Sequence, residues 1–385
     1  MNVKDILTQE YEKILEQTGI SLRYKISLQR SFEDKMEFYA NLYDEIEQAE
    51  KNDYASSVGG IIKKMQNAGI AKKDTLEYLR SQYKPNRTPF EHLIRSYEKE
   101  IEDMLSSVGF PLPKNVLTGE LPINSFNAQA CRTKSGGLIV LINSELFLFL
   151  YQVSRIYSNS MVIAKSSTPS EVVSNSVFDF PKACKALAEC LYAYIVDRDS
   201  GNAPRYPKNS GIRDNIESHL LRGAEFFVVA HEFGHILSGH LGEEKDIKKC
   251  ILDTDDLVTL NLIEKSWKEE YEADSVGLGL LSEYSLRLKN AHGSEVGKNF
   301  QPFTLGGACL FFCLDDYIIS AVNILNGLEI EHKWISDHPH PKDRINALQQ
   351  KLADIPDTLA LYMQIAKMFD DWKPLTMEYF KQMLI

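Results

Sequence analysis

Residues 230–240 read Ala230-His231-Glu232-Phe233-Gly234-His235-Ile236-Leu237-Ser238-Gly239-His240, and this stretch contains the motif HExxH. On a helix, His231 and His235 are one turn apart on the same face, so their imidazoles can bind one zinc ion. Glu232 follows the first histidine, where its carboxylate can reach a metal-bound water as a base. Apolar residues precede the motif and Gly242 lies beyond its expected end, so the sequence predicts a helix here.

The motif alone leaves two interpretations open. Random composition produces HExxH in roughly one chain in a hundred of this length, and two histidines on an apolar helix can be ordinary core residues. Catalytic zinc normally takes three protein ligands, so a third ligand distinguishes the two. His240 comes five residues after His235 and would point to a different helix face. We therefore expect His240 to pack or to support a ligand rather than to bind the metal.

A better third ligand lies downstream, in the acidic run Glu269-Glu270-Tyr271-Glu272-Ala273-Asp274-Ser275. The apolar pattern predicts a helix over about 257–286, in which Glu270 and Asp274 share one face. Glu270 can complete a metal site, and Asp274 can accept the free N–H of a ligand histidine, which fixes its tautomer. An acidic helix run is usually a solvated face. Its position after HExxH makes this one the leading candidate for the third ligand.

Composition limits the classes of function. The chain has 385 residues, more than the roughly 250–300 at which one hydrophobic core stops growing, so we expect more than one region. The formal net charge of −11 argues against a nucleic-acid-binding protein.

The six cysteines form no CxxC pair, and Cys309 and Cys313 are predicted to be two thiols on one core helix. The N-terminus lacks a signal peptide pattern and no apolar run is long enough to span a bilayer, so we expect a cytoplasmic protein without a membrane span.

The predicted fold class is α+β, predominantly helical, with one small sheet. Residues 1–108 have helical periodicity, and the best-marked helix begins after Thr88. The prolines in Phe110–Pro113 predict a boundary. We expect strands at Ile123–Ala130 and Gly137–Ile142, helices at 144–157 and 181–195, a mostly helical chain from Asp214 onward, and a loop at His292–Lys298. The predicted regions are a helical N-terminal region (1–108), a central domain (115–353) and C-terminal helices packing on it (354–385).

These landmarks resemble a family of gluzincin metallopeptidases, the HtpX and CAAX-prenyl-protease type, in which HExxH on one helix is followed by ExxAD on the next. The segment Ile123–Ala128 resembles that family's "NAF" strand, and Gly137–Leu141 with Asn143–Leu146 resembles its next strand and first helix. His338-Pro339-His340-Pro341-Lys342-Asp343-Arg344-Ile345 matches the family's HPxxxxRI segment. The resemblance covers about 230 residues and implies a zincin-like metallopeptidase core. Classical members of that family span the membrane, whereas we expect no membrane span in this chain.

The resemblance also implies roles for individual residues. His231, His235 and Glu270 would bind one Zn²⁺ per chain, Glu232 would act as base and then acid, and Asp274 would orient His231. His338 and Arg344 would lie near the cleft, one stabilising the oxyanion or holding a glutamate in place. The strand containing Asn124, Ser125, Phe126 and Asn127 would bind an extended peptide by main-chain pairing. A second resemblance, to bacterial proteins of the Lit-like phage-exclusion protease type, rests on HEFGHILSGHL and GGACLFFCLDD.

The sequence therefore predicts a cytoplasmic zinc endopeptidase that acts on protein or peptide substrates. In this interpretation the N-terminal region, 1–108, serves recognition or regulation by a protein or peptide. The main alternative is a gated or inactive peptidase-like sensor or effector, for example in phage defence, that acts through partner binding by that region. A helical scaffold without a metal would require every landmark to be coincidental.

Overall fold

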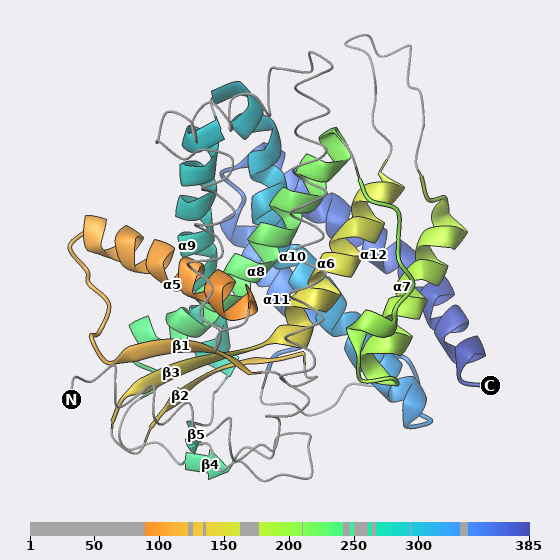
Figure 1. Ribbon diagram of the computed structural model, residues 1–385, viewed down its shortest axis with the longest axis horizontal. Helices are drawn as coiled ribbons and strands as arrows, with labels where there is room; N and C mark the ends of the chain where they lie inside the picture. Colours follow the sequence, from red (N-terminus) through yellow and green to blue (C-terminus); the bar gives the residue numbers. More distant parts are fainter. Residues whose placement is uncertain are drawn as a thin grey trace, which may run out of the picture.

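A computed structural model of the chain describes residues 89–121, 126–133, 136–161, 177–209, 211–241, 247–249, 261–263, 267–292, 294–331 and 338–385 (Figure 1). Within these ranges lie eight α-helices: α5 (Pro89–Ser107), α6 (Ser144–Ser160), α7 (Phe180–Ile195), α8 (Ile212–Leu237), α9 (Trp267–His292), α10 (Ser294–Leu325), α11 (Pro341–Lys351) and α12 (Pro356–Met383). The strands are β1 (Val116–Leu121), β2 (Ala128–Arg132), β3 (Leu138–Asn143), β4 (Ile247–Lys249) and β5 (Asn261–Ile263). The prediction of a predominantly helical α+β fold with a small sheet is confirmed.

The main sheet has three strands in the order β1-β3-β2. Strand β3 pairs in parallel with β1, from Val116 opposite Leu138, and antiparallel with β2, from Ala128 opposite Ile142. Every residue of β3 is buried, as expected for a central strand covered on both faces. The sheet lies under one end of the helices (Figure 1). Strands β4 and β5 form a separate antiparallel pair.

Four local predictions were wrong. Strand β1 was not predicted, because its residues VLTGEL include a glycine and alternate too weakly to stand out. The strand expected at Ile123–Ala130 instead occupies Ala128–Arg132, so Phe126 and Asn127 precede it. The helix expected from about residue 257 begins at Trp267, and β5 lies within the extra length. Residues from Ser294 onward belong to α10 rather than to a loop.

Helix α8 is the central element of the fold. It contacts α6, α9, α10 and α5 as well as strands β2 and β3. Its side chains from Ala224 to Ile236 are all buried. A helix that is apolar and buried on every side needs neighbours all round, and here helices and the sheet provide them. The HExxH motif at the C-terminal end of α8 is therefore enclosed by other elements.

Two glycines allow neighbouring helices to approach α8 closely. A Cβ atom added at Gly307 of α10 would lie 2.2 Å from the backbone nitrogen of Ala224 in α8. A Cβ atom added at Gly234, inside the HExxH motif, would lie 2.7 Å from the backbone oxygen of Ala273 in α9. Backbone atoms cannot move aside as flexible side chains do. Glycine at these two positions therefore fixes the distance between α8 and its partners.

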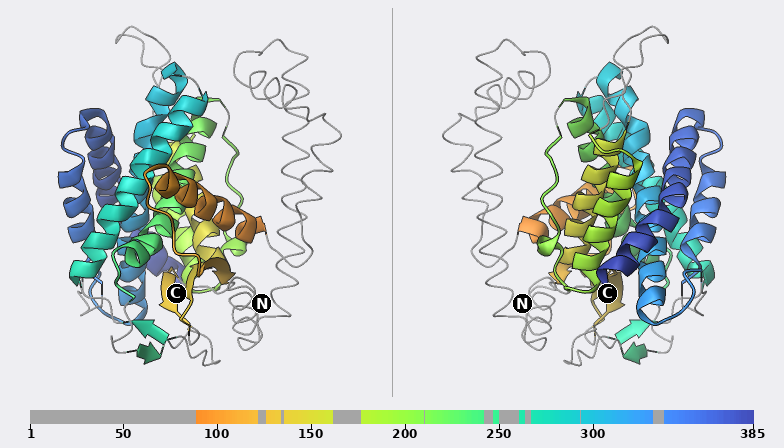
Figure 2. Two further views of the ribbon diagram at one scale, coloured as in Figure 1. Left: turned by 90° about the vertical axis from the view of Figure 1, so that its left-hand side faces the viewer. Right: turned by 90° about the vertical axis from the view of Figure 1, so that its right-hand side faces the viewer.

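Both ends of the described chain share one hydrophobic core with the middle. In α5, the Tyr97 ring packs edge-on against Phe226 of α8, with centroids 5.6 Å apart. In α12, Phe369 stacks on Tyr157 of α6 at 6.2 Å. Figure 2 shows α5 and α12 on opposite sides of the central helices. The region boundaries near 108–115 and 353–354 stay predictions, and residues 1–88 lie outside the described part of the chain.

Helix α10 contains one segment that is long and apolar enough to cross a membrane by length and composition. This segment is Phe300–Leu325, with a mean hydropathy of 1.7 in its most apolar window, and 61% of that window is buried inside the protein. A core helix of a globular protein meets the same criteria. Here α8, α9, α11 and α12 all pack against α10. The expectation that the chain has no membrane span stays a prediction.

The close approach at Gly234 makes a testable prediction about stability. Gly234→Ala should lower the free energy of unfolding by about 1–3 kcal/mol, because the methyl group must displace the backbone of α9. Gly279→Ala is the matched control, because Gly279 is an exposed residue of α9 with no atom within 4 Å of the added Cβ. This control should be neutral or stabilising by up to about 1 kcal/mol, since alanine is the better helix former. Urea unfolding followed by circular dichroism measures both. Equal stability of the two variants would contradict the packing at Gly234.

Candidate metal centre

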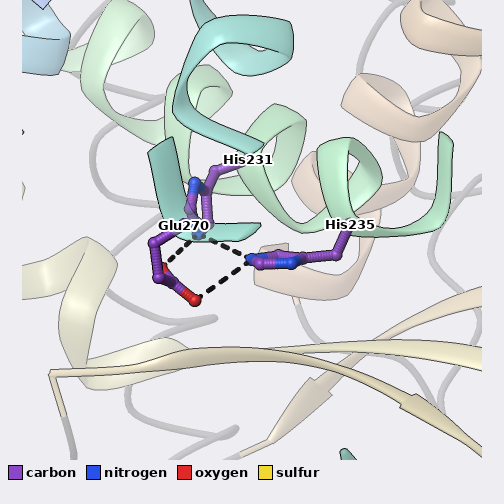
Figure 3. A group of neighbouring side chains, drawn as sticks. All are labelled: His231, His235 and Glu270. Carbon is purple, nitrogen blue, oxygen red and sulfur yellow. Dashed lines mark hydrogen bonds and ion pairs between the residues drawn. The ribbon is translucent and has the colours of Figure 1, made fainter. Parts of the chain in front are cut away.

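The two motif histidines project from α8 toward one point (Figure 3). His231 is 8% exposed and His235 is fully buried. Their Nε2 atoms are 3.2 Å apart. A four-residue spacing on a helix places both side chains on one face, as the sequence predicted.

Glu270 reaches the same point from α9, and no part of it is exposed. Its Oε2 lies 3.4 Å from Nε2 of His231, and its Oε1 lies 3.4 Å from Nε2 of His235. A tetrahedral zinc ion with bonds of about 2.0–2.1 Å keeps its ligand atoms about 3.3–3.4 Å apart. The measured separations are close to this spacing, although each histidine is nearest to a different oxygen of Glu270, and together the three side chains could hold a metal ion.

The hydrogen bond behind His231 determines which of its nitrogens faces the site as an acceptor in the neutral ring. Nδ1 of His231 lies 2.9 Å from Oδ1 of Asp274, and a carboxylate can only accept, so Nδ1 carries the proton. In neutral His231 the Nε2 lone pair then points toward Glu270. Both oxygens of Glu270 are buried, and neither makes a well-aligned hydrogen bond to a described residue. Two imidazoles and one carboxylate thus converge on one buried point, and these donor groups fit a metal ion.

Arg344, from α11, holds the acidic partners in place. Its Nε and Nη2 donate to the two oxygens of Asp274 at 2.8 and 2.6 Å, and Nη2 lies 3.4 Å from Oε2 of Glu270. Its guanidinium also lies over the ring of Phe312, 4.4 Å from the centroid. This bidentate geometry fixes the Asp274 carboxylate, which in turn orients His231. The residue supports the ligands, and its guanidinium faces Asp274 rather than open solvent.

His240 contacts the other candidate ligand, His235. Helix α8 ends at Leu237, and Gly239 adopts a φ of 73°, which turns the chain back toward the helix. Nδ1 of His240 then lies 2.9 Å from Nδ1 of His235. The prediction that His240 points to a different helix face was wrong in its reason, because α8 ends before His240. The contact places His240 beside the candidate ligand His235, on the far side of the imidazole from Glu270.

The charges at this centre favour binding of a cation. Burial lowers the pKa of His231, but its hydrogen bonds with Asp274 and Glu270 outweigh burial and raise that pKa to about 9. Burial raises the pKa of Glu270, yet contacts with His231 and His338 bring it well below the usual range. The pKa of Asp274 is also lowered, because Arg344 and His231 outweigh the effect of burial. Both carboxylates are therefore ionised at neutral pH, and a metal ion that binds here must displace the proton from Nε2 of His231.

A cleft of about 740 Å³ opens onto two of the three candidate ligands, His231 and Glu270, from the side of α10 and α11. Glu232 is 3% exposed and lines this cleft together with His231 and Glu270. His338 also lines it, with 47% of its side chain exposed and its Nδ1 3.0 Å from Oε2 of Glu270. The structure thus brings the expected base and both expected cleft residues, His338 and Arg344, to one cavity.

The predicted peptide-binding strand is only partly described. Asn124 and Ser125 lie outside the described residues. Phe126 and Asn127 line the cleft and lead into β2, an edge strand of the main sheet. The Phe126 ring stacks on Phe311 of α10, with centroids 5.1 Å apart. These two residues border the cavity from a turn, while the strand itself begins one residue later.

Several cleft residues were not anticipated from the sequence. They come from the start of α9, from α10 and from the start of α11: Trp267, Phe311, Asp315, Ile319, His340 and Asp343. A signal did exist for α10, because Phe311, Asp315 and Ile319 are spaced by four residues and place a charge on one face of a largely apolar helix. The cysteine pair in the same helix proved to be structural. Cys309 and Cys313 are both buried, with their sulfurs 3.9 Å apart.

Comparisons with protein-family models, curated proteins and solved structures find no significant match to this chain. The interpretation of the site therefore depends on its residues and their geometry.

The ligand assignment predicts how metal content responds to two substitutions on α9. Glu270→Gln should reduce bound divalent metal from about one ion per chain to near zero, because a neutral amide is a poor ligand. Glu272→Gln is the matched control, since this glutamate lies on the same helix but has a half-exposed side chain beside His240. It should retain the metal. Elemental analysis after dialysis measures both variants. Metal retained by Glu270→Gln and lost by Glu272→Gln would overturn the ligand assignment.

The position of His240 makes a separate prediction. His240→Ala should keep about one metal ion per chain but bind it about 10–100-fold more weakly, as expected when a group behind a ligand is removed. Competition with a chelator of known affinity measures the change. His240→Gln, which can still accept a hydrogen bond from His235, should recover part of the affinity. Complete loss of the metal in His240→Ala would indicate that His240 is itself a ligand.

Proposed function

We propose that this protein is a zinc-dependent endopeptidase that hydrolyses peptide bonds of protein substrates. The observation that carries the proposal is the convergence of His231, His235 and Glu270 at tetrahedral spacing, with Glu232 lining the same cleft. Two histidines and one glutamate are the ligand set of a common class of zinc peptidases. Three protein ligands leave one position for water or substrate, which a catalytic site requires and a structural site lacks.

Zinc is proposed over other metals because of the donor atoms. Two imidazole nitrogens and one carboxylate suit zinc, whereas magnesium and calcium prefer sites made of oxygen alone. The ligand spacing of 3.2–3.4 Å also fits the short bonds of a tetrahedral ion. Asp274 and His240 contact the outer nitrogens of the two histidines, an arrangement that orients ligands and raises their basicity.

When bound, zinc would polarise the scissile carbonyl and lower the pKa of the attacking water to about 7. Glu232 accepts the proton that this water loses on attack and delivers it to the leaving amine nitrogen. Its burial in the cleft keeps bulk water away from this transfer. Arg344 holds Asp274 and thereby keeps His231 in one orientation throughout. In this proposal Glu232 carries the proton, and Arg344 and Asp274 keep the centre rigid.

His338 is proposed to stabilise the charge that develops on the substrate carbonyl oxygen. It lines the cleft, is about half exposed, and presents Nδ1 to Glu270. As an imidazolium it donates from both ring nitrogens, one to Glu270 and one to the oxyanion. Phe126 and Asn127 border the same cavity, where they would contact the substrate main chain before it reaches the edge of β2.

Glu232→Gln tests the assignment of the base. The variant should keep about one zinc per chain and lose at least about 100-fold in cleavage rate, because a general base contributes about 10²–10⁴-fold. Glu283→Gln, on an exposed face of α9 and paired with Arg287, is the control and should cleave normally. Unbiased peptide libraries analysed by mass spectrometry supply the substrates. Cleavage that survives in Glu232→Gln would show that another group is the base.

Mapping of new protein N-termini in cells tests the activity itself. Cells expressing the wild type should contain N-termini that are absent from cells expressing Glu232→Gln. These new termini identify the substrates. If the wild type carries zinc and yet produces no new termini in cells and no cleaved peptides in vitro, the endopeptidase proposal is wrong. The peptidase-like effector that acts through a binding partner would then be the better interpretation.

A further inference from the structure

One wall of the cleft is a face of α10. Phe311, Asp315 and Ile319 are spaced by four residues, so their side chains lie one above another along the helix, and all three line the cleft. Phe311 stacks on Phe126 and thereby joins this wall to the opposite border of the cavity. The wall is apolar above and below Asp315. A single carboxylate between two apolar side chains resembles a binding pocket with one charge-specific group.

Asp315 has no partner within the described residues, neither a cation within 4.0 Å nor a hydrogen-bond donor. Its neighbour Asp316 provides the contrast. Asp316 Oδ2 accepts from Nζ of Lys373 at 2.8 Å and lies 3.9 Å from Nζ of Lys342. The two adjacent acids thus face different sides of α10, about 100° apart around the helix. Asp316 is neutralised inside the protein, whereas Asp315 faces the cleft.

The cations nearest to Asp315 are engaged elsewhere. Arg344 is bound to Asp274, and His338 contacts Glu270. Burial raises the pKa of Asp315 to about 6, although the charges of Arg344 and His338 lower it. A carboxylate that remains mostly ionised at neutral pH, in a partly desolvated cleft, gains free energy when a ligand brings a positive charge to it.

We propose that Asp315 is a specificity-determining residue that binds a lysine or arginine side chain of the substrate close to the scissile bond. This inference rests on the proposed endopeptidase function. The aliphatic stem of the basic side chain would pack between Phe311 and Ile319, and its charged end would pair with the carboxylate. The partner is therefore a peptide with at least one basic residue rather than a purely apolar one.

A second acid borders the cleft and provides an internal control. Asp343 lies in the first turn of α11 and is exposed. Exposed ion pairs contribute little, because water and salt screen them. If the partly buried carboxylate is the one that selects a basic residue, Asp315 should control the preference and Asp343 should not.

Peptide binding tests the proposal independently of cleavage. The protein used is full-length Glu232→Gln with its zinc content measured, so that peptides bind without being cut. Each fluorescent peptide carries one arginine at a chosen position, and its partner carries citrulline, a neutral side chain of similar shape. At one position, citrulline should weaken binding at least about tenfold in fluorescence anisotropy, because a desolvated charge pair contributes more than an exposed one. Adding Asp315→Asn should abolish this difference, and adding Asp343→Asn should preserve it.

A charge reversal provides a second variant. Asp315→Lys, in the same background, should prefer glutamate at the position where arginine was preferred. The proposal is overturned if no position distinguishes arginine from citrulline, if Asp315→Asn leaves the difference intact, or if Asp343→Asn removes it. The two proposals fail separately. If the wild type cleaves peptides without a preference for basic residues, the endopeptidase proposal stands and the role of Asp315 is wrong. If the protein binds basic peptides selectively but never cleaves any peptide, the binding role of Asp315 stands and the endopeptidase proposal is wrong.

Discussion

The contact between α8 and α9 at Gly234 and Ala273 is the constraint on which the centre depends. Only a residue without a Cβ atom lets the backbone of α9 lie directly against the HExxH turn. Ala273 stands between Glu270 and Asp274 in sequence, so the same contact brings one carboxylate to the inner nitrogens of the histidines and the other to an outer nitrogen. The ligand set is therefore a consequence of how closely two helices pack.

Around this contact, the polar side chains form a continuous support. Arg344 fixes Asp274, Asp274 fixes His231, and His240 fixes His235. Each of these groups is buried, so a missing partner would leave an unsatisfied charge or donor in a medium of low dielectric. A buried network with such costs holds one geometry. The proposed chemistry requires that rigidity, because a metal ligand displaced by about 1 Å loses its function.

The sequence predicted most of the centre but only part of the cleft lining. HExxH and the acidic pair at Glu270 and Asp274 depend on helical spacing, which is a local property and can be read directly. The start of α9 and strand β1 were missed, since short elements are determined by tertiary pairing more than by pattern. The spacing of Asp315 in α10 was a signal, but the spacing alone does not tell which side of the helix borders the cleft. The exposure of Asp315 to the cleft depends on how α10 is rotated against α8, and the adjacent Asp316 has the same sequence signal and the opposite environment.

The central claim is that His231, His235 and Glu270 form one zinc site with an open position. X-ray absorption spectroscopy at the zinc edge of the purified full-length protein tests it most directly. The claim predicts about one zinc per chain, with only nitrogen and oxygen neighbours at about 2.0–2.1 Å and outer-shell scattering from two imidazoles. Replacing Glu270 with glutamine should remove this signal. A spectrum with sulfur neighbours at about 2.3 Å, or a protein that takes up no zinc, would contradict the account.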